Sequence, residues 1–152
     1  MNRKMRNGIR DFVAAVNPMI KVKFQKWDLE CEVYEDTLYI GKCYDKRTDR
    51  YFENFIHTLN PDCNFNVFLL SLLHEIGHIE TWDEDVADEK EIIYGLLKLT
   101  YDEEQNLTDK EMEAYCQSYY RIPLEQNATQ WGIDFAMAHP QLMEKYSWLN
   151  NY

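Results

Sequence analysis

The sequence predicts one mostly helical α+β domain over residues 1–152, with a short three-stranded antiparallel sheet before a buried helix. Apolar residues recur at helical spacing in most of the chain, whereas alternation with polar residues is confined to a region that begins at Lys21. The chain has the length of one ordinary domain, and 45% hydrophobic and 14% aromatic residues are sufficient to form a core. No repeat or low-complexity linker divides it.

The N-terminal part of the chain predicts one helix followed by the sheet. Apolar residues at helical spacing from residue 3 to about residue 16 indicate a helix that ends at Asn17-Pro18. Alternation from Lys21 onward then indicates three short antiparallel strands, and the polar turn Glu35-Asp36-Thr37 separates the last two. The apolar positions of these strands are Val22, Phe24 and Trp27, then Cys31 and Val33, then Leu38 and Ile40.

Three helical segments are predicted after the sheet. Residues 49–59 have helical spacing and are closed by Asn60-Pro61-Asp62. Residues 64–80 are apolar nearly all the way round, which in a globular protein indicates a helix buried in the core. The acidic run 83–91 favours a solvated face and leads into an amphipathic helix. The apolar residues of that helix are Ile92, Ile93, Leu96, Leu97 and Leu99.

The last part of the chain predicts three more helices. A capping box formed by Thr108 and Glu111 indicates a helix that continues to Tyr120. Pro123 disfavours helical geometry in the residue before it and suits a first helical turn, so a new helix is expected from Pro123 to about Ala138. A short helix after His139-Pro140 includes Leu142, Met143, Tyr146 and Leu149.

Charge and hydropathy exclude several classes of partner. The formal net charge of −11 disfavours binding to nucleic acid phosphates or to an anionic membrane surface. The longest apolar stretch, Phe65–Leu73, is too short to span a membrane and contains two polar residues. The N-terminal region lacks the core of a signal peptide. We therefore expect a cytoplasmic protein that acts on a protein or peptide, without nucleic acid or membrane partners.

The cysteines are scattered and form no C-x-x-C pair, so neither a zinc ribbon nor a thioredoxin-type motif is indicated. They are Cys31, Cys43, Cys63 and Cys116. We expect reduced structural thiols. Two disulfides would be the alternative in a secreted protein.

The segment His74-Glu75-Ile76-Gly77-His78 carries the strongest chemical signal in the chain. Its two histidines are four residues apart, about one helical turn, so both imidazoles can bind one zinc ion from the same helix face. Glu75 lies beside that face and can serve as the general base toward a zinc-activated water. The pattern is typical of peptide hydrolysis, and two unrelated core or surface histidines are the alternative.

A catalytic zinc site needs a third protein ligand and keeps one position open, whereas a structural site is closed by four. The remaining histidines, His57 and His139, are interpreted as polar or helix-end residues. The metzincin motif would require glycine and histidine at positions occupied by Thr81 and Glu84, so the sequence argues against that class.

In gluzincins the third ligand is a glutamate on a later helix, followed three residues on by a small residue that lets the two helices approach. Glu125 with Ala128 matches this pattern, and Gly132 falls on the same helix side. Two alternatives stay open at this point. Glu125 could simply stabilise its helix N-terminus through the macrodipole, or Glu84, six residues after His78, could be the third ligand.

The order of helix, three strands, HExxH helix and later Glu-x-x-Ala helix resembles that of the ImmA/IrrE-like zinc peptidases of bacteria and their mobile elements. The segment 120–128 (Tyr-Arg-Ile-Pro-Leu-Glu-Gln-Asn-Ala) is similar to the glutamate segment of phage-encoded relatives. This resemblance implies a zincin-like fold, Zn²⁺ bound by His74, His78 and Glu125, and catalysis by Glu75. It also implies a protein substrate, which in some relatives is a transcriptional repressor.

Two other functions are compatible with the sequence. The chain could keep a zincin-like fold and act as a catalytically inert regulatory or partner-binding protein, although such a protein has no need of Glu75. It could also be a purely structural helical protein in which the motif is accidental. No residue that stabilises the oxyanion is assigned, because Tyr119, Tyr120 and Arg121 are only neighbours of Glu125 in the sequence.

Overall fold

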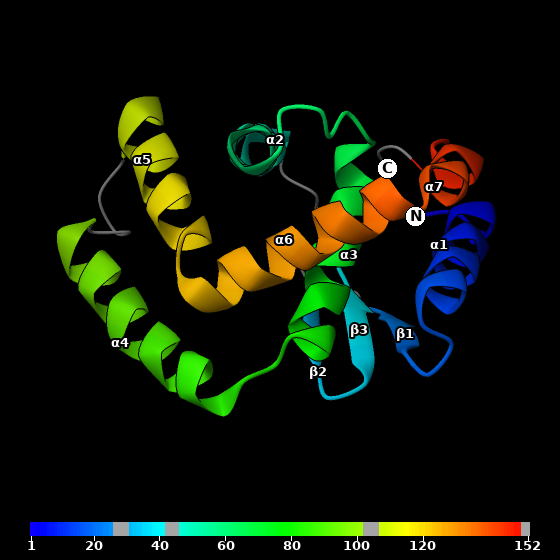
Figure 1. The fold of residues 1–152 in the computed structure, drawn as a ribbon, viewed down its shortest axis with the longest axis horizontal. Coiled ribbons are helices and arrows are strands. Elements are labelled where there is room, and N and C mark those ends of the chain that lie inside the picture. Colours follow the sequence, from blue (N-terminus) through cyan, green and yellow to red (C-terminus); the bar gives the residue numbers. More distant parts are fainter. Residues whose placement is uncertain (26–30, 42–45, 102–106, 150–152) are drawn as a thin grey trace.

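The fold is described here from a computed structural model, and the structure describes residues 1–25, 31–41, 46–101 and 107–149. Seven helices and a three-stranded sheet are present in these residues (Figure 1). The α+β class is therefore confirmed. Trp27 and Cys43 lie outside the described residues, while Cys31, Cys63 and Cys116 form no disulfide within the described residues.

The sheet consists of β1 (Lys21–Phe24), β2 (Cys31–Tyr34) and β3 (Thr37–Ile40) in the order β1-β3-β2. The β2–β3 hairpin is antiparallel, with Tyr34 opposite Thr37, but β1 pairs with β3 in parallel. The prediction of an entirely antiparallel sheet was therefore wrong. The connection from β1 to β2 is longer than a hairpin turn, which lets β1 join the far edge of β3 and leaves β2 at the opposite edge.

Helix α3 (Val67–Glu80) forms the centre of the molecule, with the sheet on one side and α6 (Pro123–Ala138) crossing it on the other (Figure 1). Asn66 caps α3, because its side chain accepts hydrogen bonds from the amides of Phe68 and Leu69. Side chains on most sides of α3 are buried, as its continuous apolar sequence predicted.

Four other helices complete the core and the C-terminal part of the fold. Helix α1 (Arg3–Val16) lies beside α7 (Pro140–Tyr146), where the rings of Phe12 and Tyr146 meet edge to face with centroids 5.5 Å apart (Figure 1). Helix α2 (Lys46–Leu59) starts three residues before the predicted boundary and packs against α5 (Asp109–Tyr120). The predicted capping box of α5 is present.

Helix α4 (Glu84–Thr100) lies at the periphery, next to α5 and the start of α6 (Figure 1). The helix was predicted, but none of its residues is fully buried. Ile92, Leu96 and Leu99 are 67%, 59% and 84% exposed. Its apolar residues therefore do not form one buried stripe. Among the described residues no helix is long and apolar enough to cross a membrane.

Small residues bring α3 and α6 into close contact. A Cβ atom added to Gly77 would lie 2.4 Å from the backbone oxygen of Ala128, and one added to Gly132 would lie 3.2 Å from Cβ of Leu73. Ala128 and Gly132 were expected to permit this approach. Gly77, the fourth residue of the HExxH segment, is a further requirement that the sequence analysis did not identify.

We predict that Gly77→Ala destabilises the protein by about 1–3 kcal/mol, because the backbone of Ala128 cannot move aside like a flexible side chain. Gly95→Ala is the matched control, since a Cβ at this position of α4 meets no atom within 4 Å. That change should stabilise the protein by about 0.5–1 kcal/mol through helix propensity. Urea unfolding of both variants measures the difference, and equal stabilisation by both would contradict the close contact.

Candidate metal centre

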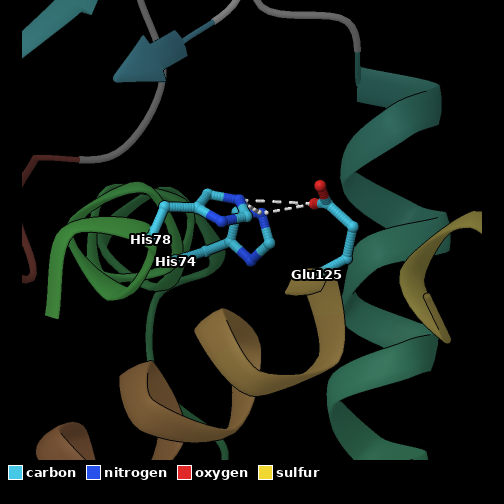
Figure 2. A group of neighbouring side chains, drawn as sticks. All are labelled: His74, His78 and Glu125. Atoms are coloured by element: carbon cyan, nitrogen blue, oxygen red, sulfur yellow. Dashed lines mark hydrogen bonds and ion pairs between the residues drawn. The ribbon is translucent and has the colours of Figure 1, made fainter. Parts of the chain in front are cut away.

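The end of α5 and the start of α6 place a carboxylate opposite the HExxH face of α3. Helix α5 ends at Tyr120, and Pro123 begins α6 after an N-cap at Ile122. Glu125 therefore lies in the first turn of α6, where its side chain points toward α3 (Figure 2). Ala128, three residues further along α6, makes the close contact with Gly77, so the same packing fixes the distance between the carboxylate and the histidines.

His74, His78 and Glu125 converge in the interior of the protein, with exposed fractions of 7%, 9% and 1% (Figure 2). The two Nε2 atoms of the histidines are 3.2 Å apart. Oε2 of Glu125 lies 3.2 Å from Nε2 of His74 and 3.4 Å from Nε2 of His78. The three atoms thus form a nearly equilateral triangle.

The dimensions of this triangle fit a small metal ion. Tetrahedral zinc with bonds of about 2.0–2.1 Å separates its ligand atoms by about 3.3 Å. In the part of the chain that the structure describes, no other group of three or more His, Cys, Asp or Glu side chains lies close enough together to hold a metal ion. Three ligands, with no fourth protein ligand among the described residues, match an open site rather than a closed structural one.

Thr129 fixes the proton of His74. Its hydroxyl donates to the carbonyl oxygen of Glu125 at 2.8 Å and lies 2.9 Å from Nδ1 of His74. With its proton used, the hydroxyl accepts from Nδ1–H, so Nε2 presents a lone pair to the triangle. Thr129 was not among the residues expected at the site, although it lies one helical turn after Glu125.

The protonation of the ligand residues agrees with this arrangement. Burial lowers the pKa of His74, which favours the neutral imidazole that a metal requires. Burial alone would raise the pKa of the Glu125 carboxyl, but its contacts with His74 and His78 lower it below the ordinary value. Neutral imidazole and ionised carboxylate are the forms that bind a divalent cation.

The triangle opens into a cavity of about 350 Å³. Glu75 lines this cavity beside the two histidines, and β2 lines it with Cys31, Glu32 and Val33. Lys90 of α4 also reaches it, with Nζ 2.6 Å from Oε1 of Glu125. Lys90 was missed because it lies in an acidic run that was interpreted as a solvated face.

The other residues considered from the sequence have different positions. Tyr119 and Tyr120 line the cavity, but Arg121 does not. Glu84 is exposed in the first turn of α4 and belongs neither to the triangle nor to the cavity lining. His57 is exposed near the end of α2. The remaining histidine, His139, is exposed between α6 and α7, and its Nδ1 lies 2.8 Å from the carbonyl oxygen of Phe135.

Comparison of the chain with models of protein families, with curated proteins and with solved structures gives no match. The chemical interpretation of the site therefore depends on its own residues and distances.

Proposed function

We propose that this chain is a zinc-dependent peptidase that hydrolyses a protein or peptide substrate. The observation that supports this most directly is the triangle of His74, His78 and Glu125 with a carboxylate, Glu75, in the same cavity. A metal site that only binds a partner or only stabilises the fold does not need such a base. We propose the ImmA/IrrE-like zinc peptidases as the family.

Each ligand residue has a defined part in this function. His74 and His78 would hold the ion through Nε2, and Glu125 would hold it through Oε2. When bound, zinc lowers the pKa of a water molecule and polarises the scissile carbonyl. Thr129 keeps the His74 ring in the required tautomer and orientation.

Glu75 would act as the general base and then as the general acid. Its carboxylate accepts a proton from the attacking water and delivers that proton to the nitrogen of the leaving amine. Glu75 is adjacent to His74 on α3 and lines the cavity without belonging to the ligand triangle. Glu75 would therefore not be a metal ligand, whereas its neighbours His74 and His78 would be.

The edge strand β2 offers a surface for the substrate backbone. An extended peptide adds to a sheet edge through main-chain hydrogen bonds, and side-chain pockets then provide specificity. Because Cys31, Glu32 and Val33 line the cavity beside the histidines, a peptide along β2 would pass the triangle. This placement favours a peptide over a compact small molecule as the substrate.

Tyr119 is the cavity residue best suited to stabilise a developing oxyanion. Burial raises the pKa of its phenol, and the charge of Glu125 raises it further. The phenol therefore keeps its proton and can donate a hydrogen bond. Arg121, the cation closest to Glu125 in the sequence, does not reach the cavity.

The first test is the metal content and activity of the full chain purified without a histidine tag. After zinc reconstitution and removal of free metal, we expect about one zinc ion per chain. A peptide library analysed by mass spectrometry should show products with the zinc-loaded protein and none after chelation, and zinc should restore cleavage. Substoichiometric zinc would contradict the whole proposal, whereas one bound zinc without cleavage would favour a catalytically inert binding protein.

A further inference from the structure

The two carboxylate oxygens of Glu125 have different partners. Oε2 faces the imidazoles of His74 and His78, whereas Oε1 lies 2.6 Å from Nζ of Lys90. The Glu125 side chain is only 2% exposed, and Oε1 has no partner with hydrogen-bond geometry among the described residues. The contact with Lys90 is thus an ion pair that compensates a buried charge.

The position of Lys90 on α4 is not that of an ordinary surface lysine. Its side chain is only 24% exposed and is turned toward the cavity. The neighbouring residues Glu89 and Glu91 are instead exposed to solvent. A lysine side chain turned inward loses hydration and rotamer freedom, which only a well-placed carboxylate offsets. Helix α4, although it lies at the periphery, therefore contributes a specific contact to a ligand residue.

We propose that Lys90 is a positioning residue for the metal site. Its ammonium holds Oε1 of Glu125, so that Oε2 alone faces the two histidines. This inference rests on the proposed function. Rotation of the carboxylate to offer both oxygens would pull Oε1 away from the ammonium and leave both charges poorly compensated. Lys90 therefore keeps Glu125 a ligand through one oxygen, and a coordination position stays open for the reaction.

A different role for Lys90 makes the opposite prediction. If the ammonium merely neutralised Glu125, it would compete with the metal, and its removal would raise zinc affinity. The geometry argues against competition, because the ammonium contacts Oε1 and leaves Oε2 to the histidines. The direction of the change in zinc affinity therefore separates the two roles.

The experiment compares Lys90→Met and Lys90→Arg with the parent chain by zinc competition titration and by the visible spectrum of the cobalt-loaded proteins. We expect Lys90→Met to weaken zinc binding about tenfold or more, the usual cost of losing a partner of a metal ligand. Its cobalt spectrum should become weaker, because four-coordinate cobalt absorbs visible light more strongly than five-coordinate cobalt. Lys90→Arg, which keeps the charge, should restore much of both properties.

Lys98→Met is the matched control, since Lys98 lies on the same helix, contacts the ring of Tyr94 with Nζ 4.4 Å from its centre, and does not line the cavity. It should bind zinc and cobalt like the parent. Unchanged or tighter zinc binding by Lys90→Met would overturn the inference. Weaker binding with an unaltered cobalt spectrum would also overturn it, because general destabilisation would explain that result. Failure of the parent chain to bind zinc would instead reject the proposed function itself.

Discussion

Glu75→Gln is expected to slow peptide hydrolysis by about 10²–10⁴-fold while zinc stays bound. The amide has the size of the carboxylate but cannot accept a proton from water. Because Glu75 lines the cavity without belonging to the ligand triangle, its loss should not change the metal site. Rates on a peptide identified by library cleavage, together with zinc content of the same samples, measure both effects.

Glu80→Gln provides the control for this prediction. Glu80 is also on α3, but it is exposed and accepts a hydrogen bond from Asn17 at 2.6 Å, outside the cavity. This variant should cleave at the parental rate. A parental rate for Glu75→Gln would show that Glu75 is not the base, and loss of zinc from that variant would show that it belongs to the metal site.

The order and approximate limits of the helices could be predicted because their signals are local. Proline at position 123, the capping box at Thr108 and the continuous apolar sequence of α3 each act within a few residues. Pairing of β1 was not predictable in this way. Alternation identifies a strand, but it carries no information on which neighbour the strand joins or in which direction.

The behaviour of α4 shows a second limit of local patterns. Its sequence predicts a helix with many apolar residues, yet Ile92, Leu96 and Leu99 are exposed because α4 lies at the edge of the domain. Periodicity describes the helix itself and cannot specify how much of it the rest of the chain covers. Periodicity likewise could not specify that the side chain of Lys90 turns inward, because this orientation also depends on how α4 packs against the rest of the chain.

The candidate site was predictable where the spacing alone determines the geometry. Two histidines four residues apart on one helix must face the same side, so His74 and His78 could be paired from the sequence. The selection of Glu125 required, in addition, the gluzincin pattern of a glutamate followed three residues on by a small residue, here Ala128. Thr129 reaches the site through the packing of α6 against α3, and Lys90 reaches it through the packing of α4 against α6. The spacing of residues along the chain does not specify which side chains these contacts bring to the site.

Glu125→Ala is expected to weaken zinc binding by at least about tenfold, whereas Glu84→Ala should leave it nearly unchanged. Oε2 of Glu125 is within 3.2 and 3.4 Å of the two histidine nitrogens, so its removal deletes one of three ligand atoms. Glu84 is exposed at the start of α4, beyond the turn at Thr81 that ends α3. Zinc competition titrations on both variants compare the two carboxylates directly.

Removal of Glu125 also leaves Lys90 without its partner, so a loss of zinc affinity could arise from a damaged fold. Two additions separate these effects. Glu125→Gln keeps the side-chain volume and should still weaken zinc binding, because an amide oxygen without formal charge is a poorer ligand for zinc. Thermal unfolding of the metal-free variants then reports the fold alone. A larger loss of zinc affinity for Glu84→Ala than for Glu125→Ala, with both proteins folded, would reverse the assignment of the third ligand and reject the gluzincin arrangement.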